Sequence, residues 1–258
     1  IDLIGVPFDL GASVRGASMG AQALRIAGIG ERLASLGHTV NDLGDVAASA
    51  RAVQLSGKAN HANAVASIVN PLQDAVYQSL QEEHMPLIIG GDHSISFGSL
   101  AAAARHAAHK GKPLFVLWLD AHADFNTPQT SPSGNMHGMP VALIAGLPGF
   151  DGLMETTFPI VPAHQITMIG VRSIDSDERR SVAKAGINLF DMRMVDEFGM
   201  AVLVRRTIES VKRASGMLHV SFDADFLDPS IAPGVGTDVK GGATWREAHL
   251  AMELLADS

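Results

Sequence analysis

Short runs of consecutive apolar residues recur along the chain, and longer segments whose apolar positions repeat with helical spacing separate them. An apolar run without polar alternation is typical of a strand that is buried on both faces of a sheet. On this pattern, strands are predicted at residues 1–7, 39–43, 86–89, 113–119, 165–171, 187–190 and 216–222.

The segments between these runs have the spacing and the end signals of helices. The first ends at Gly37, a residue type that commonly closes helices, and the second contains Pro71, which must either kink it or begin a second helix. The last begins at Thr244 as N-cap, with Glu247 three residues later in a capping-box arrangement. Helices are predicted at residues 21–36, 58–84, 94–108, 137–146, 177–185, 199–214 and from 244 onward.

Strands and helices thus alternate from end to end, with no internal repeat and no linker. This alternation predicts a single α/β domain over residues 1–258 with a mainly parallel sheet. Because the chain begins inside a predicted strand and stops inside a predicted helix, we expect it to be clipped at both ends.

Composition narrows the classes of function. Hydrophobic residues make up 47% of the chain and charged residues only 18%, which suits a sheet covered on both faces. The net charge is −8 and no run of Lys and Arg exceeds two residues, so nucleic acid and anionic membranes are excluded as partners. No apolar run reaches 18 residues, and the absence of cysteine excludes disulfides and thiolate-ligated zinc. We expect a cytoplasmic protein.

Side chains of the types that bind metal ions are concentrated where predicted strands end. Asp120, His122 and Asp124 directly follow the strand at 113–119, and their spacing of two turns successive side chains toward the same side. Three such groups within five residues are costly to hold together unless a cation lies between them.

Two further strands end in the same way. Asp223 and Asp225 follow the strand at 216–222, and His93 follows the strand at 86–89. In open α/β sheets the crevice outside the carboxyl ends of the strands is where ligands bind. The sequence therefore predicts a metal site at this edge of the sheet.

The strand ends supply six candidate metal ligands: His93, Asp120, His122, Asp124, Asp223 and Asp225. Oxygen-rich sets of this kind suit hard divalent ions, and the two imidazoles favour Mn²⁺ over Mg²⁺ or Ca²⁺. Six side chains exceed the needs of one catalytic ion, whereas two ions about 3.5–4 Å apart would use them all. The neighbouring Asp92 and Asp228 are equally well explained as a helix cap and a turn residue.

Three segments carry a resemblance to a known family. The sequences GGDHS at 90–94, DAHADFN at 120–126 and SFDADFLDP at 221–229 resemble the three signatures of the ureohydrolase family, which comprises arginases, agmatinases and related guanidino- and formimino-hydrolases. The likeness extends from GVPFDLGASVRGASMG near the start to GGATWREA near the end. The loop at 126–138 is most similar to that of the arginase branch.

This resemblance implies a three-layer α/β/α domain with a mainly parallel central sheet, two Mn²⁺ ions per chain and a hydroxide that bridges them. Attack of the hydroxide on a guanidinium carbon would give a tetrahedral intermediate, and Asp124 would pass the proton to the leaving amine. Family members are trimers or hexamers, so a homotrimer or homohexamer is expected. By motif position, one ion takes His93, Asp120, Asp124 and Asp223, and the other takes His122, Asp225 and shares of Asp120, Asp124 and Asp223.

The resemblance also implies how a substrate is held. Asn126, Ser133 and Asn135 match the residues that bind the α-carboxylate of L-arginine, and Asp175 matches the acid that binds its α-ammonium group. An amino-acid substrate needs both kinds of partner, whereas agmatine needs neither. Asn126 and Ser133 also fit as plain turn residues, and Asp175 also fits as a helix cap.

Two more positions match, and two features depart from the family. His137 matches the proton-shuttle histidine, although it also fits as a histidine without a role at a helix N-terminus, and Thr237 matches a position near the guanidinium. Ser173 stands where arginases usually carry an acid just before Asp175. The family's guanidinium-binding glutamate would lie beyond Ser258.

The resemblance therefore implies a manganese hydrolase that converts L-arginine to L-ornithine and urea. Agmatine, another guanidino acid or formiminoglutamate is the alternative substrate for the same chemistry. A non-catalytic arginase-like protein whose metal only stabilises the fold is a third hypothesis, and a binuclear metallophosphatase is a more remote one.

Overall fold

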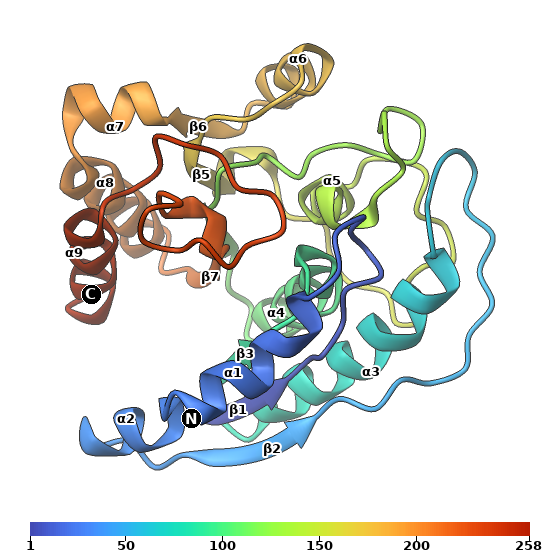
Figure 1. The fold of residues 1–258 in the computed structure, drawn as a ribbon, viewed down its shortest axis with the longest axis horizontal. Coiled ribbons are helices and arrows are strands. Elements are labelled where there is room, and N and C mark those ends of the chain that lie inside the picture. The colour runs from blue at the N-terminus through green and yellow to red at the C-terminus, as the bar shows by residue number, and fades with distance from the viewer. The chain divides into compact units, whose positions relative to one another are not determined.

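A computed structural model describes residues 1–258, and its contacts fall into two compact units (Figure 1). The first unit comprises residues 1–106 and 126–159, and the second comprises residues 107–125 and 160–258. Each unit contains one sheet, and the strand pairs in both sheets are parallel. The predicted α/β class with mainly parallel strands is confirmed, and the single domain over residues 1–258 stays a prediction.

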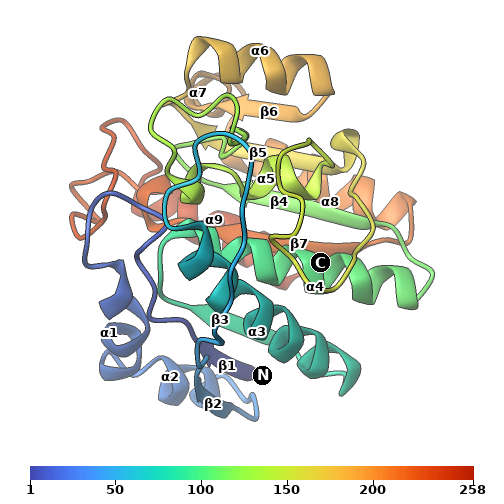
Figure 2. The same ribbon diagram turned by 90° about the vertical axis from the view of Figure 1, so that its right-hand side faces the viewer.

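The sheet of the first unit has the strand order β2-β1-β3. The chain leaves β1 in one direction to reach β2 and returns across β1 to reach β3, so right-handed crossovers place the connecting helices on opposite faces (Figure 2). The strands are β1 (Asp2–Gly5), β2 (Asn41–Asp45) and β3 (Pro86–Ile89), and the helices that begin in this unit are α1 (Gly20–Ile26), α2 (Ile29–Ser35), α3 (Ala62–Gln81), α4 (Ser96–His109) and α5 (Pro140–Ile144).

One helix predicted at 21–36 is in fact two. Gly28 lies between α1 and α2 with φ 81°, a left-handed conformation that interrupts the helical ladder and that glycine adopts at little cost. The two helices still cover one face of the sheet, where Ala21 and Ile29 pack with Leu3 and Ile89. Apolar spacing alone could not locate the break, because it continues across Gly28.

The segment predicted at 58–84 is a single helix, α3, which continues through Pro71. A proline inside a helix leaves the carbonyl four residues earlier without its helical donor. That carbonyl belongs to Ser67, and it accepts a hydrogen bond from the Ser49 N–H at 2.8 Å instead. A contact from the preceding loop therefore compensates for Pro71, and of the two predicted alternatives the second helix does not occur.

The sheet of the second unit has the strand order β6-β5-β4-β7, so β4 lies between β5 and β7. Its strands are β4 (Leu114–Leu119), β5 (Ile166–Val171), β6 (Asn188–Asp191) and β7 (Met217–Phe222), and all four agree with the sequence prediction apart from end residues. The helices of this unit are α6 (Ser176–Ala185), α7 (Met192–Phe198), α8 (Met200–Arg213) and α9 (Trp245–Ala256).

Helices α7, α8 and α9 gather on one side of this sheet (Figure 1). Their apolar residues, including Val195, Leu203 and Leu254, share one buried cluster with Leu117 and Leu119 of β4. Helix α7 was missed by the pattern analysis, which assigned no element to residues 192–198. It is held at its start by Asp191, whose side chain accepts a hydrogen bond from the Met194 N–H.

The strand β5 carries a bulge beside Asp120. Its register with β6 shifts between Ile169 and Val171, and Gly170 between them has φ 101°. A Cβ atom at Gly170 would lie 2.5 Å from the ring of Phe226. Glycine is therefore required both for the backbone conformation and for the close packing of Phe226.

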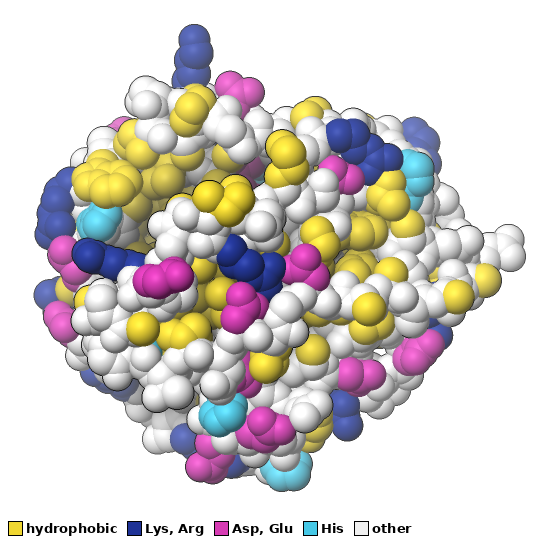
Figure 3. Space-filling view, turned by 60° about the horizontal axis from the view of Figure 1, so that its bottom comes forward, with side chains coloured by type: hydrophobic (Ala, Val, Ile, Leu, Met, Phe, Trp, Pro, Cys, Tyr) yellow, Lys and Arg dark blue, Asp and Glu magenta, His cyan; other side chains and the backbone are white.

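The surface carries mixed charge. Figure 3 shows one face, on which acidic and basic side chains are interspersed rather than gathered by sign. No helix combines the length and the apolar character that crossing a bilayer requires.

Candidate metal centre

The centre is built on the ends of two adjacent strands. Leu119 of β4 pairs with Phe222 of β7, so both strands end at the same level. Past Leu119, Oδ1 of Asp120 accepts a hydrogen bond from the His122 N–H at 2.7 Å. Past Phe222, Oδ1 of Asp223 accepts one from the Asp225 N–H at 2.9 Å. Each acid therefore turns its own chain sharply as the strand ends.

These turns bring three predicted ligands together, and we call them the Asp120–His122–Asp225 cluster. Their ligand atoms all lie within 4.8 Å of one another. The Nδ1 atom of His122 lies 3.4 Å from Oδ1 of Asp120 and 3.2 Å from Oδ2 of Asp225. Both carboxylates are almost fully buried. Two buried anions on one imidazole make a strong site for positive charge.

The pKa of His122 also indicates that this site favours positive charge. Burial lowers the pKa of His122, but hydrogen bonds to Asp120 and Asp225 and the nearby charge of Asp124 outweigh it and raise the pKa to about 11. In the absence of metal a proton on the imidazole thus balances the carboxylates. A divalent cation would meet the same demand with more charge, so these residues fit a metal ion.

Asp225 is further fixed by its neighbours. Its Oδ1 accepts a hydrogen bond from the Ala121 N–H at 3.2 Å, and its Oδ2 accepts one from the Thr237 hydroxyl at 2.8 Å. Thr237, predicted near the substrate, therefore contacts a predicted ligand. Asp228 is occupied by its own loop: its carboxylate accepts hydrogen bonds from Ser230 and from two glycine N–H groups, which hold its pKa well below the usual range.

Asp124 is buried and has φ 47°, in the left-handed region that few side chains adopt. The next residue, Phe125, donates its N–H to Oε1 of Glu178 at 2.8 Å. Glu178 lies in the first turn of α6 and is itself buried, which raises its pKa. Sequence reasoning missed Glu178, and its only signal was an acid three residues after the helix start at Asp175.

Asp175 occupies the N-cap position of α6, but its side chain makes no capping hydrogen bond and it is exposed. Its backbone N–H is instead a partner of Glu178. The helix-cap alternative for the Asp175 carboxylate therefore has no hydrogen bond to support it, and the predicted role toward an ammonium group stays a prediction.

The first unit carries the remaining predicted residues. His93 begins the 3-10 turn η2 (His93–Ile95), which follows β3 after a three-residue connection. The preceding Asp92 caps this turn by accepting from the Ser94 N–H, and it also accepts from the N–H groups of Gly11 and Ala12. The helix-cap interpretation of Asp92 is thereby borne out.

The loop at 126–138 is tied together by its own polar groups. Asn126 accepts a hydrogen bond from the Thr130 hydroxyl, and the Ser133 hydroxyl accepts one from the Asn135 N–H. Asn135 also exchanges hydrogen bonds with Ser13. The His137 N–H donates to the Gly11 carbonyl at 3.1 Å, within the turn η3 (Met136–Gly138). These contacts fit the turn interpretation of Asn126 and Ser133, and the carboxylate-binding role stays a prediction.

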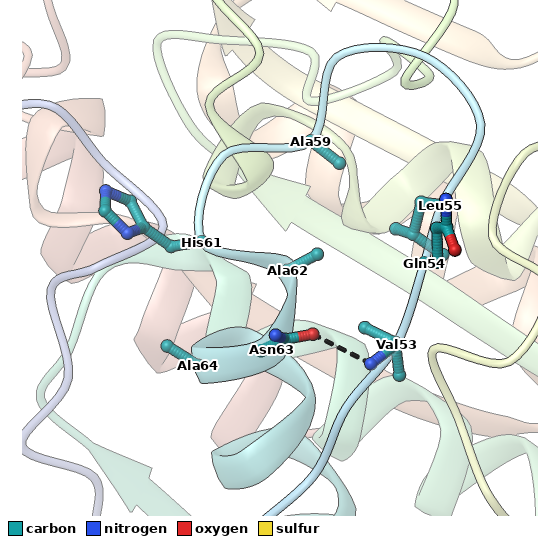
Figure 4. Close-up of a pocket in the computed structure, with 8 residues that line it drawn as sticks. All are labelled: Val53, Gln54, Leu55, Ala59, His61, Ala62, Asn63 and Ala64. Carbon is teal, nitrogen blue, oxygen red and sulfur yellow. Dashed lines mark hydrogen bonds between the residues drawn. The ribbon is translucent and has the colours of Figure 1, made fainter.

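The first unit also carries a surface hollow of about 460 Å³. It is lined by residues 53–55, 59 and 61–64, where Asn63 accepts a hydrogen bond from the Val53 N–H (Figure 4). None of the predicted site residues lines it.

Fold and site together define a class of protein: a parallel α/β protein with a carboxylate–imidazole centre at the carboxyl ends of adjacent strands. The model of the arginase family matches residues 1–258. The chain therefore belongs to the arginase family, and the resemblance read from its motifs is confirmed.

Individual relatives agree with this assignment. The chain is 46% identical over 258 residues to the arginase of Brucella melitensis, covering 99% of this chain and 84% of the relative. The crystal structure of an arginase from Bacillus subtilis matches with a TM-score of 0.90 at 41% identity, covering 99% and 86% of the two chains. That of an arginase from Bacillus caldovelox matches with a TM-score of 0.90 at 43% identity, with the same coverage.

Proposed function

We propose that this protein hydrolyses the guanidinium group of L-arginine to give L-ornithine and urea, with two Mn²⁺ ions as cofactor. The observation that carries the proposal is the Asp120–His122–Asp225 cluster at the carboxyl ends of β4 and β7, in a chain of the arginase family. Agmatine and other guanidino or formimino compounds remain the alternative substrates. The ligands would be His93, Asp120, His122, Asp124, Asp223 and Asp225.

Divalent ions held by these residues would lower the pKa of water toward neutrality and stabilise negative charge as it develops on the substrate. The protein's own task is then to move protons. Asp124 would accept the proton that the attacking water loses and return it to the leaving amine. His137 would exchange protons between the leaving amine and bulk water, because an imidazole titrates near neutral pH.

Substrate selection would rest on the two charged groups at the α-carbon. Asn126, Ser133 and Asn135 carry short neutral donors on a loop that is already ordered by its own hydrogen bonds, so little conformational entropy is lost when they bind a carboxylate. Asp175 is exposed and its carboxylate makes no capping bond, which suits an ammonium partner.

The test is to measure urea release by the full chain with Mn²⁺, using L-arginine and agmatine at equal concentrations. We expect turnover of L-arginine and little of agmatine. Asp124→Asn is the matched variant, because asparagine tolerates the left-handed conformation at this position and removes the proton acceptor. Because Asp124 is also a proposed metal ligand, bound Mn²⁺ per chain is measured beside urea release, so that loss of metal and loss of proton transfer are told apart. A preference for agmatine would overturn the substrate, and full activity of Asp124→Asn would overturn the proton transfer.

A further inference from the structure

Arg172 follows β5 directly, and its guanidinium group is directed at backbone carbonyls rather than at a carboxylate. All of these carbonyls belong to the second unit. The strongest bonds run from Nη2 to the Asp225 carbonyl at 2.6 Å and to the Val239 carbonyl at 2.7 Å. Longer contacts join Nη2 to Leu227, Nη1 to Phe226 and Gly170, and Nε to Val239.

The backbone of the same residue holds the other part of the cluster. The N–H groups of Arg172 and Ser173 both donate to the Ala121 carbonyl, at 2.9 and 3.0 Å. Ala121 lies between Asp120 and His122. Arg172 therefore contacts both turns of the cluster. Its backbone N–H binds the turn after β4, and its side chain binds the turn after β7.

The bond pattern explains why arginine stands here. Carbonyls from 225, 227 and 239 converge on one plane of N–H donors, and only a guanidinium offers a rigid fork with that many donors. A lysine ammonium has three donors at a single point and cannot span the same carbonyls. Gly242 makes room for the group, since a Cβ atom there would lie 2.6 Å from Nη2.

The charge of Arg172 has a second effect. Burial lowers its pKa, and the acids Asp225, Asp228 and Asp120 raise it. A guanidinium stays charged under all ordinary conditions. It therefore offsets part of the repulsion among these carboxylates, while its hydrogen bonds go to backbone carbonyls.

We propose that Arg172 is a positioning residue for the metal centre, which fixes Asp225 and the Thr237-bearing loop relative to Asp120 and His122. The proposal rests on the proposed function in assuming that these residues bind Mn²⁺. It predicts that changing Arg172 weakens metal binding even where the fold is kept.

The experiment compares Arg172→Lys with Arg179→Lys in the full chain. Arg179 is the matched control, because it is half-exposed on α6 and its charged partner is Asp191, outside the cluster. Bound Mn²⁺ per chain and its Kd are measured by equilibrium dialysis and calorimetry, well below the melting temperature of each metal-free protein. For Arg172→Lys we expect a rise of about 10–100-fold in Kd for one of the two ions, as is usual when an outer partner of a ligand is lost. Arg179→Lys should bind as the parent does.

These readouts separate positioning from plain structural support, which would lower the melting temperature of the metal-free protein and leave Kd unchanged. Arg172→Met, which leaves no buried charge without partners, is the second variant if the lysine variant does not fold. Unchanged Kd in a folded variant, or failure of both variants to fold, would overturn the proposal. If the parent binds Mn²⁺ but releases no urea, the proposed function fails while the variants still decide the role of Arg172.

Discussion

At the scale of single residues, the main feature of this protein is a group of ionisable side chains buried close together. Asp120, His122 and Asp225 meet within 4.8 Å, and their balance of charge requires either a proton or a cation. The proton and the metal therefore compete for the same imidazole. That competition makes metal binding dependent on pH in a direction that can be stated in advance.

Metal binding should release a proton from His122. In the metal-free protein the pKa of His122 is about 11, against an ordinary value of 6.5. The stability that the imidazolium contributes is therefore complete below pH about 6.5 and is lost as the pH rises through about 11. Because a metal-bound nitrogen carries no proton, Mn²⁺ affinity should rise with pH across this window. Calorimetry near pH 8 in buffers of different ionisation enthalpy should show that the parent releases about one proton per chain more than a variant without this imidazole, because any proton lost by metal-bound water is common to both.

The variant for this comparison is His122→Asn, in which the buffer dependence of the binding enthalpy should fall by the share of about one proton. Binding enthalpies of the parent that are the same in every buffer would contradict the predicted release.

Residues that could be predicted from sequence are those that end apolar strands. Asp120, His122, Asp223 and Asp225 stand out because ligand-type side chains directly follow buried runs. Glu178 and Arg172 could not be found in this way. Their partners are backbone groups of Phe125 and Asp225, which lie about fifty residues away in sequence, and no pattern around either residue records such a contact.

At the scale of elements, sequence signals were reliable where backbone N–H groups find hydrogen-bond partners within a few residues. Helix α9 begins at the predicted N-cap: the Thr244 side chain accepts from the Glu247 N–H, and the Glu247 side chain accepts from the Thr244 N–H. Both partners lie within four residues, so the sequence alone specifies the motif. The break at Gly28 was not predicted, because the apolar spacing continues across it. The continuous passage of α3 through Pro71 was not predicted either, because it depends on a hydrogen bond from Ser49, outside the helix.

Removing this cap should destabilise the protein by a modest amount. Thr244→Ala deletes the acceptor for the Glu247 N–H, and the free energy of unfolding should fall by about 1 kcal/mol in urea denaturation. Thr244→Ser keeps the hydroxyl and should retain most of that stability. Equal stability of the alanine and serine variants would show that the capping box contributes nothing measurable.

At the scale of the whole molecule, the two compact units are interleaved in sequence. The chain passes from one unit to the other after residues 106, 125 and 159, so each unit is made of two separate segments. A segment of each unit therefore interrupts the sequence of the other. The predicted homotrimer or homohexamer and the cytoplasmic location stay predictions.

This interleaving predicts cooperative unfolding. We expect one transition by differential scanning calorimetry, with equal calorimetric and van't Hoff enthalpies, because loss of either unit releases the segment ends that the other requires. Both tryptophans, Trp118 in β4 and Trp245 in α9, lie in the second unit, so their fluorescence reports that unit alone, and its midpoint should coincide with that of the single calorimetric transition. Two resolved transitions would show that the units are independent domains and would contradict the predicted single domain.

The sequence by itself determined the strands, most of the helices and the ligand-bearing strand ends, because burial and local capping leave periodic marks within a few residues. Only the tertiary structure decided which ligands meet. The pairing of β4 with β7 brings Asp225 to Asp120 and His122 across about one hundred residues of chain. The tertiary structure likewise decided the supporting contacts of Arg172 and Glu178. Their partners are backbone groups, which every residue carries, so only their position in space singles them out.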